Sequence, residues 1–124
     1  MQNIRTLTPD EPIVIDSHRI AQIRLRVGPD ADDLVCQALE QIAAGSARLH
    51  RAARDGDTRG TGKEAARLSR LAGQIGLVSL AGVAADVFAC TRLGDPAALA
   101  ATLERARRVT DRSLSAIGDW ETAG

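Results

Sequence analysis

Two histidines and two cysteines are the residues of this 124-residue chain whose side chains are most suited to act as nucleophiles or metal ligands. An exposed imidazole can serve as a nucleophile or a base. Of the two histidines, His50 lies in a long segment with helical periodicity, whereas His18 follows Asp16 and is expected on the surface. Cys36 and Cys90 stand apart and lack the CxxC spacing of a metal or redox site. We therefore expect both cysteines to be small core residues.

Basic side chains gather in the segment from Arg48 to Arg70. It holds seven basic residues and three acidic ones, although the whole chain is neutral with sixteen of each sign. The seven are Arg48, Arg51, Arg54, Arg59, Lys63, Arg67 and Arg70. A local excess of this kind is typical of a docking surface for an acidic partner, but a solvated helix face has the same composition. The sequence leaves both interpretations open.

Composition and spacing argue against several classes of function. One Trp, one Phe and no Tyr leave little to stack on bases, and the net charge is zero, so we expect no nucleic-acid partner. No long apolar run and no secretory start occurs, so we expect a cytoplasmic protein without a membrane partner. The segment from Gly56 to Lys63 lacks the spacing of a phosphate-binding loop, and the carboxylates lack a Glu-x-x-His pair. We therefore expect neither a cofactor nor a metal.

Hydrophobic periodicity predicts one domain over residues 1–124 that is built from helices alone. Alternation of β-branched residues is absent, and Ala, Leu, Arg and Glu dominate. We expect an extended segment over 1–15, a short helix over 16–27, long helices over 32–54, 62–75, 79–92 and 96–117, and a tail over 118–124. Four long helices with short connections predict an antiparallel four-helix bundle preceded by a short helix.

Local sequence predicts where these helices begin. Asp16 and Ser79 are residues of the kind that cap a helix, here the first and the fourth. Thr61 or Gly62 can open the helix over 62–75, and Asp95 before a proline is a strong start signal for the last one. The predicted core consists of apolar residues at helical spacing, namely Leu39, Ile42, Leu49, Leu68, Ile75, Leu80, Val87, Leu103 and Leu114.

Two glycines interrupt the apolar spacing of the segment AARLSRLAGQIGLVSL, residues 65–80. A glycine inside a helix costs roughly 1 kcal/mol relative to Ala. We therefore expect Gly73 to allow a neighbouring helix to come close. Gly76 is suited to end the helix in a left-handed conformation.

The same segment resembles the central helix of the histidine phosphotransfer (Hpt) domain, whose pattern is roughly A-H-x-L-K-G-x-A-x-x-I-G. The matching residues are Ala65, Leu68, Ala72, Ile75 and Gly76. The resemblance spans residues 13–117 and includes Ile15-Asp16 at the first helix, the turn Asp55-Gly56-Asp57 and the turn Leu93-Gly94-Asp95-Pro96. It implies the four-helix bundle of that family and a place in bacterial two-component signalling.

The function of that family depends on an exposed histidine, which carries a phosphoryl group between receiver domains or between a kinase and a receiver. The resemblance places Ala66 at the histidine, Ser69 at a lysine, and Arg70 at the small glycine that lets the receiver approach. A methyl group cannot accept a phosphoryl group. We therefore expect no catalytic residue at this position.

Three hypotheses for the function remain. The first is an Hpt-like module that docks onto a receiver domain or a histidine kinase without carrying phosphate. Its partner-binding residues would be Arg48, Arg51, Arg67, Ser69 and Arg70. The second hypothesis is phosphotransfer through a displaced histidine, His50. The third is a structural or dimerisation bundle without a role in signalling.

Overall fold

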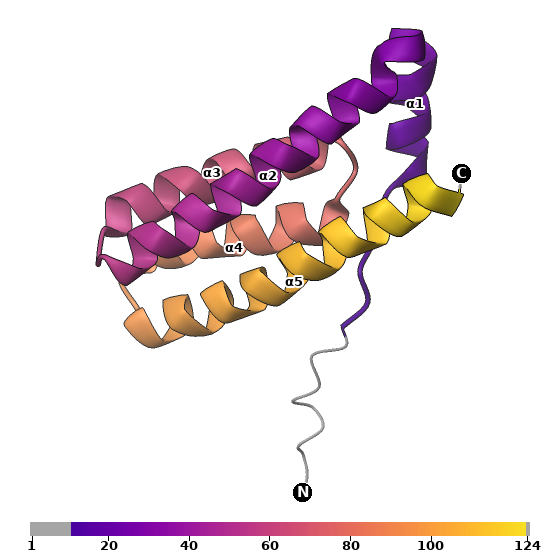
Figure 1. Cartoon of the computed structure of the whole chain (residues 1–124). Helices are drawn as coiled ribbons and strands as arrows, with labels where there is room; N and C mark the ends of the chain where they lie inside the picture. The colour runs from indigo at the N-terminus through magenta and orange to yellow at the C-terminus, as the bar shows by residue number, and fades with distance from the viewer. Residues whose placement is uncertain (1–10, 124) are drawn as a thin grey trace, which may run out of the picture.

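The chain forms an all-α antiparallel four-helix bundle with a short helix before it, which confirms the predicted fold class. The computed structural model describes residues 11–123, and side chains as far as residue 118. The elements are α1 (Ser17–Val27), the 3₁₀ turn η2 (Gly28–Asp30), α2 (Ala31–Arg54), α3 (Thr58–Gln74), α4 (Val78–Leu93) and α5 (Pro96–Ala123). Helices α2 to α5 pack side by side, and α1 lies at the end of the bundle where α2 begins (Figure 1). None of the described helices is long and apolar enough to cross a membrane.

Aspartates begin three of the helices. Asp16 caps α1 by accepting a hydrogen bond from the Arg19 amide, as predicted, and Asp95 accepts from the amides of the first turn of α5. Helix α3 begins at Thr58, earlier than the prediction of Thr61 or Gly62. The reason is Asp57, whose carboxylate accepts a hydrogen bond from the Gly60 amide at 2.8 Å and so caps α3 from within the predicted turn.

The predicted cap of α4 and the predicted tail are both wrong. Helix α4 begins at Val78, and the Ser79 hydroxyl accepts a hydrogen bond from the Val14 amide at 2.8 Å instead of capping the helix. Residues 118–124 were expected as a tail, but α5 runs on to Ala123. Gly118 does not adopt the positive φ with which Gly94 ends α4, so nothing in the backbone stops α5 there.

One aliphatic core joins the helices. Of the predicted core residues, six are buried, namely Ile42, Leu49, Leu68, Ile75, Leu80 and Val87. Leu39, Leu103 and Leu114 are only partly buried and pack against this core. The cysteines were expected in the core, but Cys36 is exposed and Cys90 is intermediate. Successive helical residues point about 100° apart, so the buried Val35 leaves its neighbour Cys36 outside the core.

The two glycines of the motif segment have different outcomes. Gly76 has a φ of +81°, and a Cβ at this position would lie 2.7 Å from the backbone oxygen of Asp16, so its predicted left-handed conformation at a helix end is confirmed. Gly73 was expected to face a neighbouring helix closely, and this prediction is wrong. It is exposed, and a Cβ added there would meet no atom within 4 Å.

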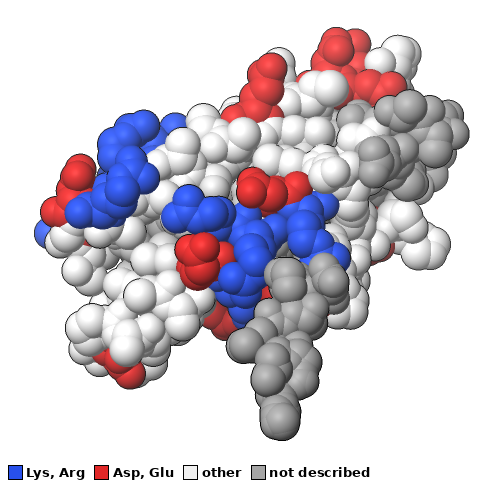
Figure 2. All heavy atoms as spheres, turned by 60° about the horizontal axis from the view of Figure 1, so that its bottom comes forward, with Lys and Arg blue, Asp and Glu red and all other residues white. Residues whose placement is uncertain are grey.

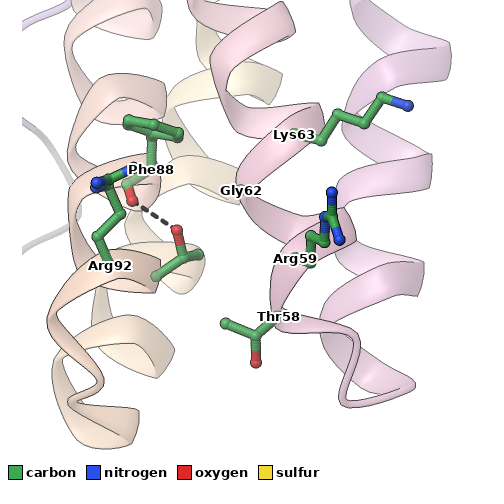
Figure 3. Close-up of a pocket in the computed structure, with 7 residues that line it drawn as sticks. Thr58, Arg59, Gly62, Lys63, Phe88 and Arg92 are labelled. Atoms are coloured by element: carbon green, nitrogen blue, oxygen red, sulfur yellow. Dashed lines mark hydrogen bonds between the residues drawn. The ribbon is translucent and has the colours of Figure 1, made fainter.

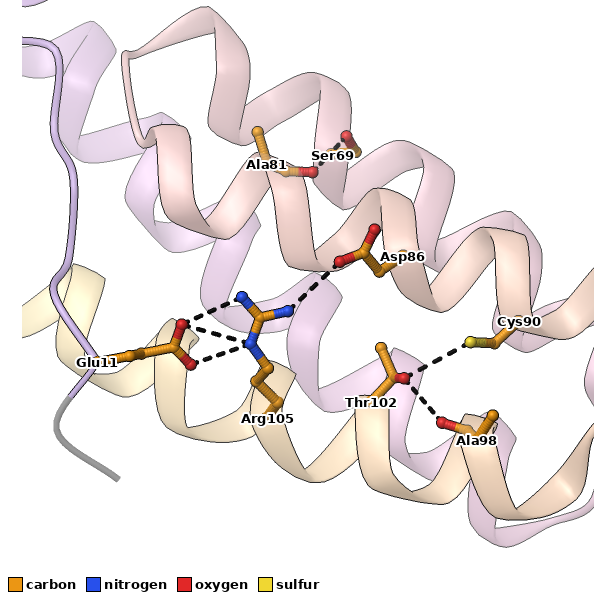
Figure 4. A network of polar contacts seen from close by, with 8 residues as sticks. All are labelled: Glu11, Ser69, Ala81, Asp86, Cys90, Ala98, Thr102 and Arg105. Carbon is orange, nitrogen blue, oxygen red and sulfur yellow. Dashed lines mark hydrogen bonds and ion pairs between the residues drawn. The ribbon is translucent and has the colours of Figure 1, made fainter. Parts of the chain in front are cut away.

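Residues 11–16, which we call the N-terminal arm, contact the α3–α4 turn, the start of α4 and the middle of α5. Ile15 forms an antiparallel bridge with Leu77 in the α3–α4 turn, and the Asp16 amide donates to the Gly76 carbonyl at 2.7 Å. At its other end, the Glu11 carboxylate receives the guanidinium of Arg105 on α5, with Nε 3.0 Å from the nearer oxygen (Figure 4). The arm therefore ties the start of α1 to the α3–α4 turn and to α5.

Candidate docking site

Ala66, which the resemblance to the Hpt domain aligns with the phosphoacceptor histidine, lies on α3. It is half-buried and follows Ala65, which is fully buried in the core. Ser69, at the position of the family's lysine, is also half-buried, and its hydroxyl donates to the Ala81 carbonyl of α4 at 2.8 Å (Figure 4). Its hydroxyl proton is therefore engaged in joining α3 to α4. Arg70 is exposed.

The predicted arginines of α2, Arg48 and Arg51, line a hollow of about 370 Å³ between α2 and α3. The positive and negative side chains that line this hollow are equal in number. Its charged lining consists of Arg48, Arg51, Lys63, Asp55, Asp57 and Glu64. Arg48 is half-buried, and its Nε lies 3.2 Å from both carboxylate oxygens of Glu64. Because Arg48 is already paired and three carboxylates line the hollow, this part of the predicted surface is not an excess of positive charge.

The outward face of α3 is the part of the predicted surface that remains basic. We call its four exposed cationic residues, Arg59, Lys63, Arg67 and Arg70, the α3 basic face; Lys63 lies at the border of this face and also lines the hollow. None of them has an ion pair within the described part of the chain. The single acidic residue of α3, Glu64, points to Arg48 on α2 and so does not neutralise this face.

Beside this face, the N-terminal half of α3 and the C-terminal half of α4 enclose a pocket of about 410 Å³. We call it the α3–α4 pocket. Its lining includes Arg59, Gly62 and Lys63 from α3 and Phe88, Thr91 and Arg92 from α4 (Figure 3). The lining contains no carboxylate. Sequence reasoning missed the residues of α4, although one signal was available: Arg92 follows the chain's only Phe by one helical turn.

Close packing of α3 on α4 shapes this pocket. A Cβ at position 62 would lie 2.8 Å from Oγ1 of Thr91, so glycine lets the two helices approach here. The Thr91 hydroxyl donates a hydrogen bond to the Phe88 carbonyl at 2.6 Å, and this bond keeps the hydroxyl close to the backbone of α4 (Figure 3). The Phe88 ring is 37% exposed, and the Arg92 guanidinium carbon lies 5.7 Å from its centroid, within the range of a cation–π contact.

His50, the candidate for displaced phosphotransfer, is buried at 8% exposure, and its Nε2 is enclosed without a hydrogen-bond partner among the described residues. It lies two residues after Arg48 and so points about 200° away from the α3 side of α2. Burial lowers the pKa of this imidazole, and the cation of Arg107 on α5 lowers the pKa further, against the opposing effect of Glu104. The structure thus turns His50 inwards rather than presenting Nε2 to a partner.

The remaining chemical groups form no further site. Among the described residues, no group of three or more His, Cys, Asp or Glu side chains could hold a metal ion. His18 is exposed on α1, as expected. On the face that carries α5, basic and acidic side chains lie next to one another (Figure 2), and Arg105 there bonds both Glu11 and Asp86.

Comparisons of this chain with protein-family models, with curated proteins and with solved structures found no match. The residues and their geometry are therefore the basis on which a function can be inferred. Of the predicted partner-binding residues, Arg67 and Arg70 lie together on an unpaired basic face. Arg48 and Ser69 serve internal contacts, and Arg51 lies in the balanced hollow.

Proposed function

We propose that this chain is an Hpt-like helical module of two-component phosphorelay signalling, which docks onto a receiver domain or a histidine kinase without itself carrying the phosphoryl group. The observation that carries this proposal is the α3 basic face, four exposed cations without an ion pair that adjoin Ala66 on the helix that resembles the Hpt motif. The resemblance implies a partner whose phosphorylation pocket is acidic. Unpaired cations beside such a pocket favour encounter and orientation.

The shape of the surface around Ala66 is consistent with docking. Gly73 on α3 and Gly82 on α4 are both exposed, and a Cβ at either would meet nothing within 4 Å. Each helix therefore has a low point in its exposed surface, where a partner can lie close to the backbone. A reactive group is missing, because Ala66 offers only a methyl group.

The exposed apolar residues favour self-association as a second candidate function. Leu25 on α1 is 87% exposed, and Leu34 at the start of α2 is 46% exposed. Exposed apolar side chains in one region are typical of interaction surfaces. Sedimentation of the chain at several concentrations would reveal a dimer, and a monomer throughout would remove this candidate.

The proposal is tested by charge reversal on the α3 basic face. Pull-down against the receivers and kinases of the same organism identifies the partner, and calorimetry then compares the parent with the Arg67→Glu/Arg70→Glu double variant. We expect affinity to fall about tenfold or more and to decrease with salt in the parent, because exposed cations act through screened electrostatic attraction. Thermal stability should stay nearly unchanged, because both residues are exposed and unpaired.

A matched control carries the same charge change elsewhere. The Arg107→Glu/Arg108→Glu variant alters two exposed arginines of α5 and should bind the partner nearly as the parent does. Equal affinity of the α3 double variant and the parent would contradict the proposal. Acid-labile phosphate on the parent after incubation with a phosphorylated receiver would also contradict the proposal. If that phosphate were absent from the His50→Ala variant, His50 would be identified as the displaced site.

A further inference from the structure

The position of the chain's only Phe calls for an explanation. The hydrophobic side chains of the described core are all aliphatic, whereas the aromatic Phe88 lies outside it and is 37% exposed at the rim of the α3–α4 pocket. A ring of this size gains most free energy when it is fully removed from water. Aromatic residues, Phe among them, and arginine are also enriched at protein interfaces.

The charges of the pocket indicate what chemistry would cover that ring. Arg59, Lys63 and Arg92 line it, and none of the three has a carboxylate partner among the described residues. The nearest acidic residues in sequence are already engaged. Asp57 caps α3 and Asp95 caps α5, while Glu64 pairs with Arg48 and Asp86 pairs with Arg105. The pocket therefore combines three cations that lack a carboxylate partner with one apolar wall.

Two other anionic ligands fit this combination less well. A nucleic acid needs several stacking side chains and a basic surface along its backbone, and this chain offers one Phe in a molecule of zero net charge. A free phosphate ion would use the cations but would leave the Phe88 ring in water. A ligand that satisfies both parts carries an acidic group next to an apolar one, which is common in a protein segment.

We propose that the α3–α4 pocket anchors an acidic segment of the partner protein, with its carboxylates held by Arg59 and Lys63 on the α3 rim and by Arg92 on the α4 rim, and with a neighbouring apolar side chain packed on Phe88. This inference rests on the proposed function in that the ligand belongs to a protein partner. It adds a second contact point beyond Arg67 and Arg70. Binding there shields the ring from water and neutralises cations that the fold itself leaves unpaired.

The test uses the full chain, labelled with ¹⁵N, and a capped heptapeptide of sequence ADLDLEA as the probe. In NMR titrations we expect saturable changes in the chemical shifts of the Gly62, Phe88 and Thr91 amides, with a Kd for the peptide below about 1 mM. A peptide in which Asn and Gln replace the acidic residues should bind about tenfold more weakly or not at all. Arg92→Glu and Phe88→Ala should each weaken binding of the acidic peptide about tenfold.

Controls separate binding from folding and from non-specific attraction. Arg92 is exposed, so Arg92→Glu should keep the parent's circular dichroism and melting temperature. If Phe88→Ala unfolds, the affinity of Arg92→Glu for the peptide alone tests the inference. The Arg107→Glu/Arg108→Glu variant should keep the parent's affinity for the peptide. Shifts confined to α5, an unchanged Kd in Arg92→Glu, or equal shifts from inorganic phosphate at the same concentration would each overturn the inference.

The outcome also distinguishes this inference from the function on which it rests. If the peptide binds in the pocket while no receiver or kinase binds the chain, the signalling proposal fails and the pocket stands as a site for another acidic protein. If a receiver binds through Arg67 and Arg70, yet Arg92→Glu and Phe88→Ala keep full affinity for it and the peptide does not bind, the pocket proposal alone fails.

Discussion

Gly73 and Gly76 lie close together at the end of α3 but in opposite environments. Gly73 has open space around its Cα, whereas Gly76 has a positive φ and the Asp16 carbonyl against it. We expect Gly73→Ala to raise the free energy of unfolding by up to about 1 kcal/mol, because Ala is the better helix former. Gly76→Ala should lower it by about 1 kcal/mol or more, because the new Cβ meets backbone in a strained conformation.

Urea denaturation of the two variants and the parent measures both changes. Gly82→Ala serves as an independent check, because Gly82 lies inside α4 and also has nothing within 4 Å of an added Cβ. Loss of stability in Gly73→Ala would mean that this glycine has a close neighbour after all. A stable Gly76→Ala variant would mean that the α3–α4 turn can adjust without cost.

His50 makes the stability of the chain depend on pH. Its pKa in the folded state is lowered below about 6.5, mainly by burial and then by Arg107, so the unfolded chain binds the proton more readily. The contribution of His50 to stability is therefore complete above about pH 6.5 and decreases as pH falls from there towards the folded-state pKa. Below the folded-state pKa, both states are protonated and the dependence ends.

Urea denaturation at a series of pH values between about 7.5 and 5.5 tests this expectation. The His50→Gln variant should lose most of the decrease in stability that the parent shows over this range. His18→Gln removes the chain's other histidine, which is exposed on α1, and should keep the parent's slope. An equal slope in parent and His50→Gln would show that other groups cause the dependence.

The residues that sequence could assign are those whose partners are near in the chain. The caps by Asp16 and Asp95 involve amides two or three residues away, and these predictions hold. Ser79 bonds the Val14 amide, 65 residues distant, so its own neighbours contain no sign of that role. Gly73 shows the same limit, since spacing alone does not tell a close helix contact from open space.

The N-terminal arm depends on one group of polar contacts with α5. The hydrogen-bonded Arg105 guanidinium lowers the pKa of Glu11, more than burial raises it, and Glu11 in turn raises the pKa of Arg105. Arg112 also donates to the backbone carbonyl of Glu11. The stabilising effect of this carboxylate is therefore present above its unfolded-state pKa of about 4.5 and is lost as pH falls through its lower folded-state value.

Replacement of Glu11 by Gln should loosen the arm rather than unfold the bundle. A partly exposed ion pair contributes about 1 kcal/mol or less, so the melting temperature should change little. The Val14 amide bonds Ser79 in the first turn of α4, and the Asp16 amide bonds Gly76 in the α3–α4 turn; hydrogen exchange of both amides should become several-fold faster. Asp32→Asn breaks the exposed pair with Arg24 at α1 and α2 and should leave those two amides unchanged.

Helix type and number were predictable, whereas the contents of the candidate site were predictable only in part. Periodicity over long segments reports the buried face of each helix, and for this reason it located α2 to α4 and the start of α5 within a few residues. The exposed positions of Arg67 and Arg70 follow from the same pattern. The pairing of Arg48 with Glu64 across the α2–α3 hairpin depends on the register between helices, which periodicity does not report.

The whole chain is electrically neutral, yet its folded surface is not uniform, because acidic and basic residues are used differently. Several carboxylates are engaged inside the structure. Asp16, Asp57 and Asp95 cap helices, and Glu11, Glu64 and Asp86 pair with arginines. The cations of the α3 basic face have no such engagement. Folding therefore separates charges that cancel in the sequence.

The contacts of the N-terminal arm also set an order of events during synthesis. Glu11 bonds Arg105, 94 residues later, and at a typical rate of elongation that partner is made roughly 5 to 20 s after the arm. Helical hairpins such as α2–α3 form in far less time than this. The arm leaves the ribosome before helices α1 to α5 and completes its contacts only after Arg105 has been made. Until then its apolar residues Ile13 and Ile15 lack part of the core against which they pack. The described residues that are made first thus complete their contacts only when α5 has been made.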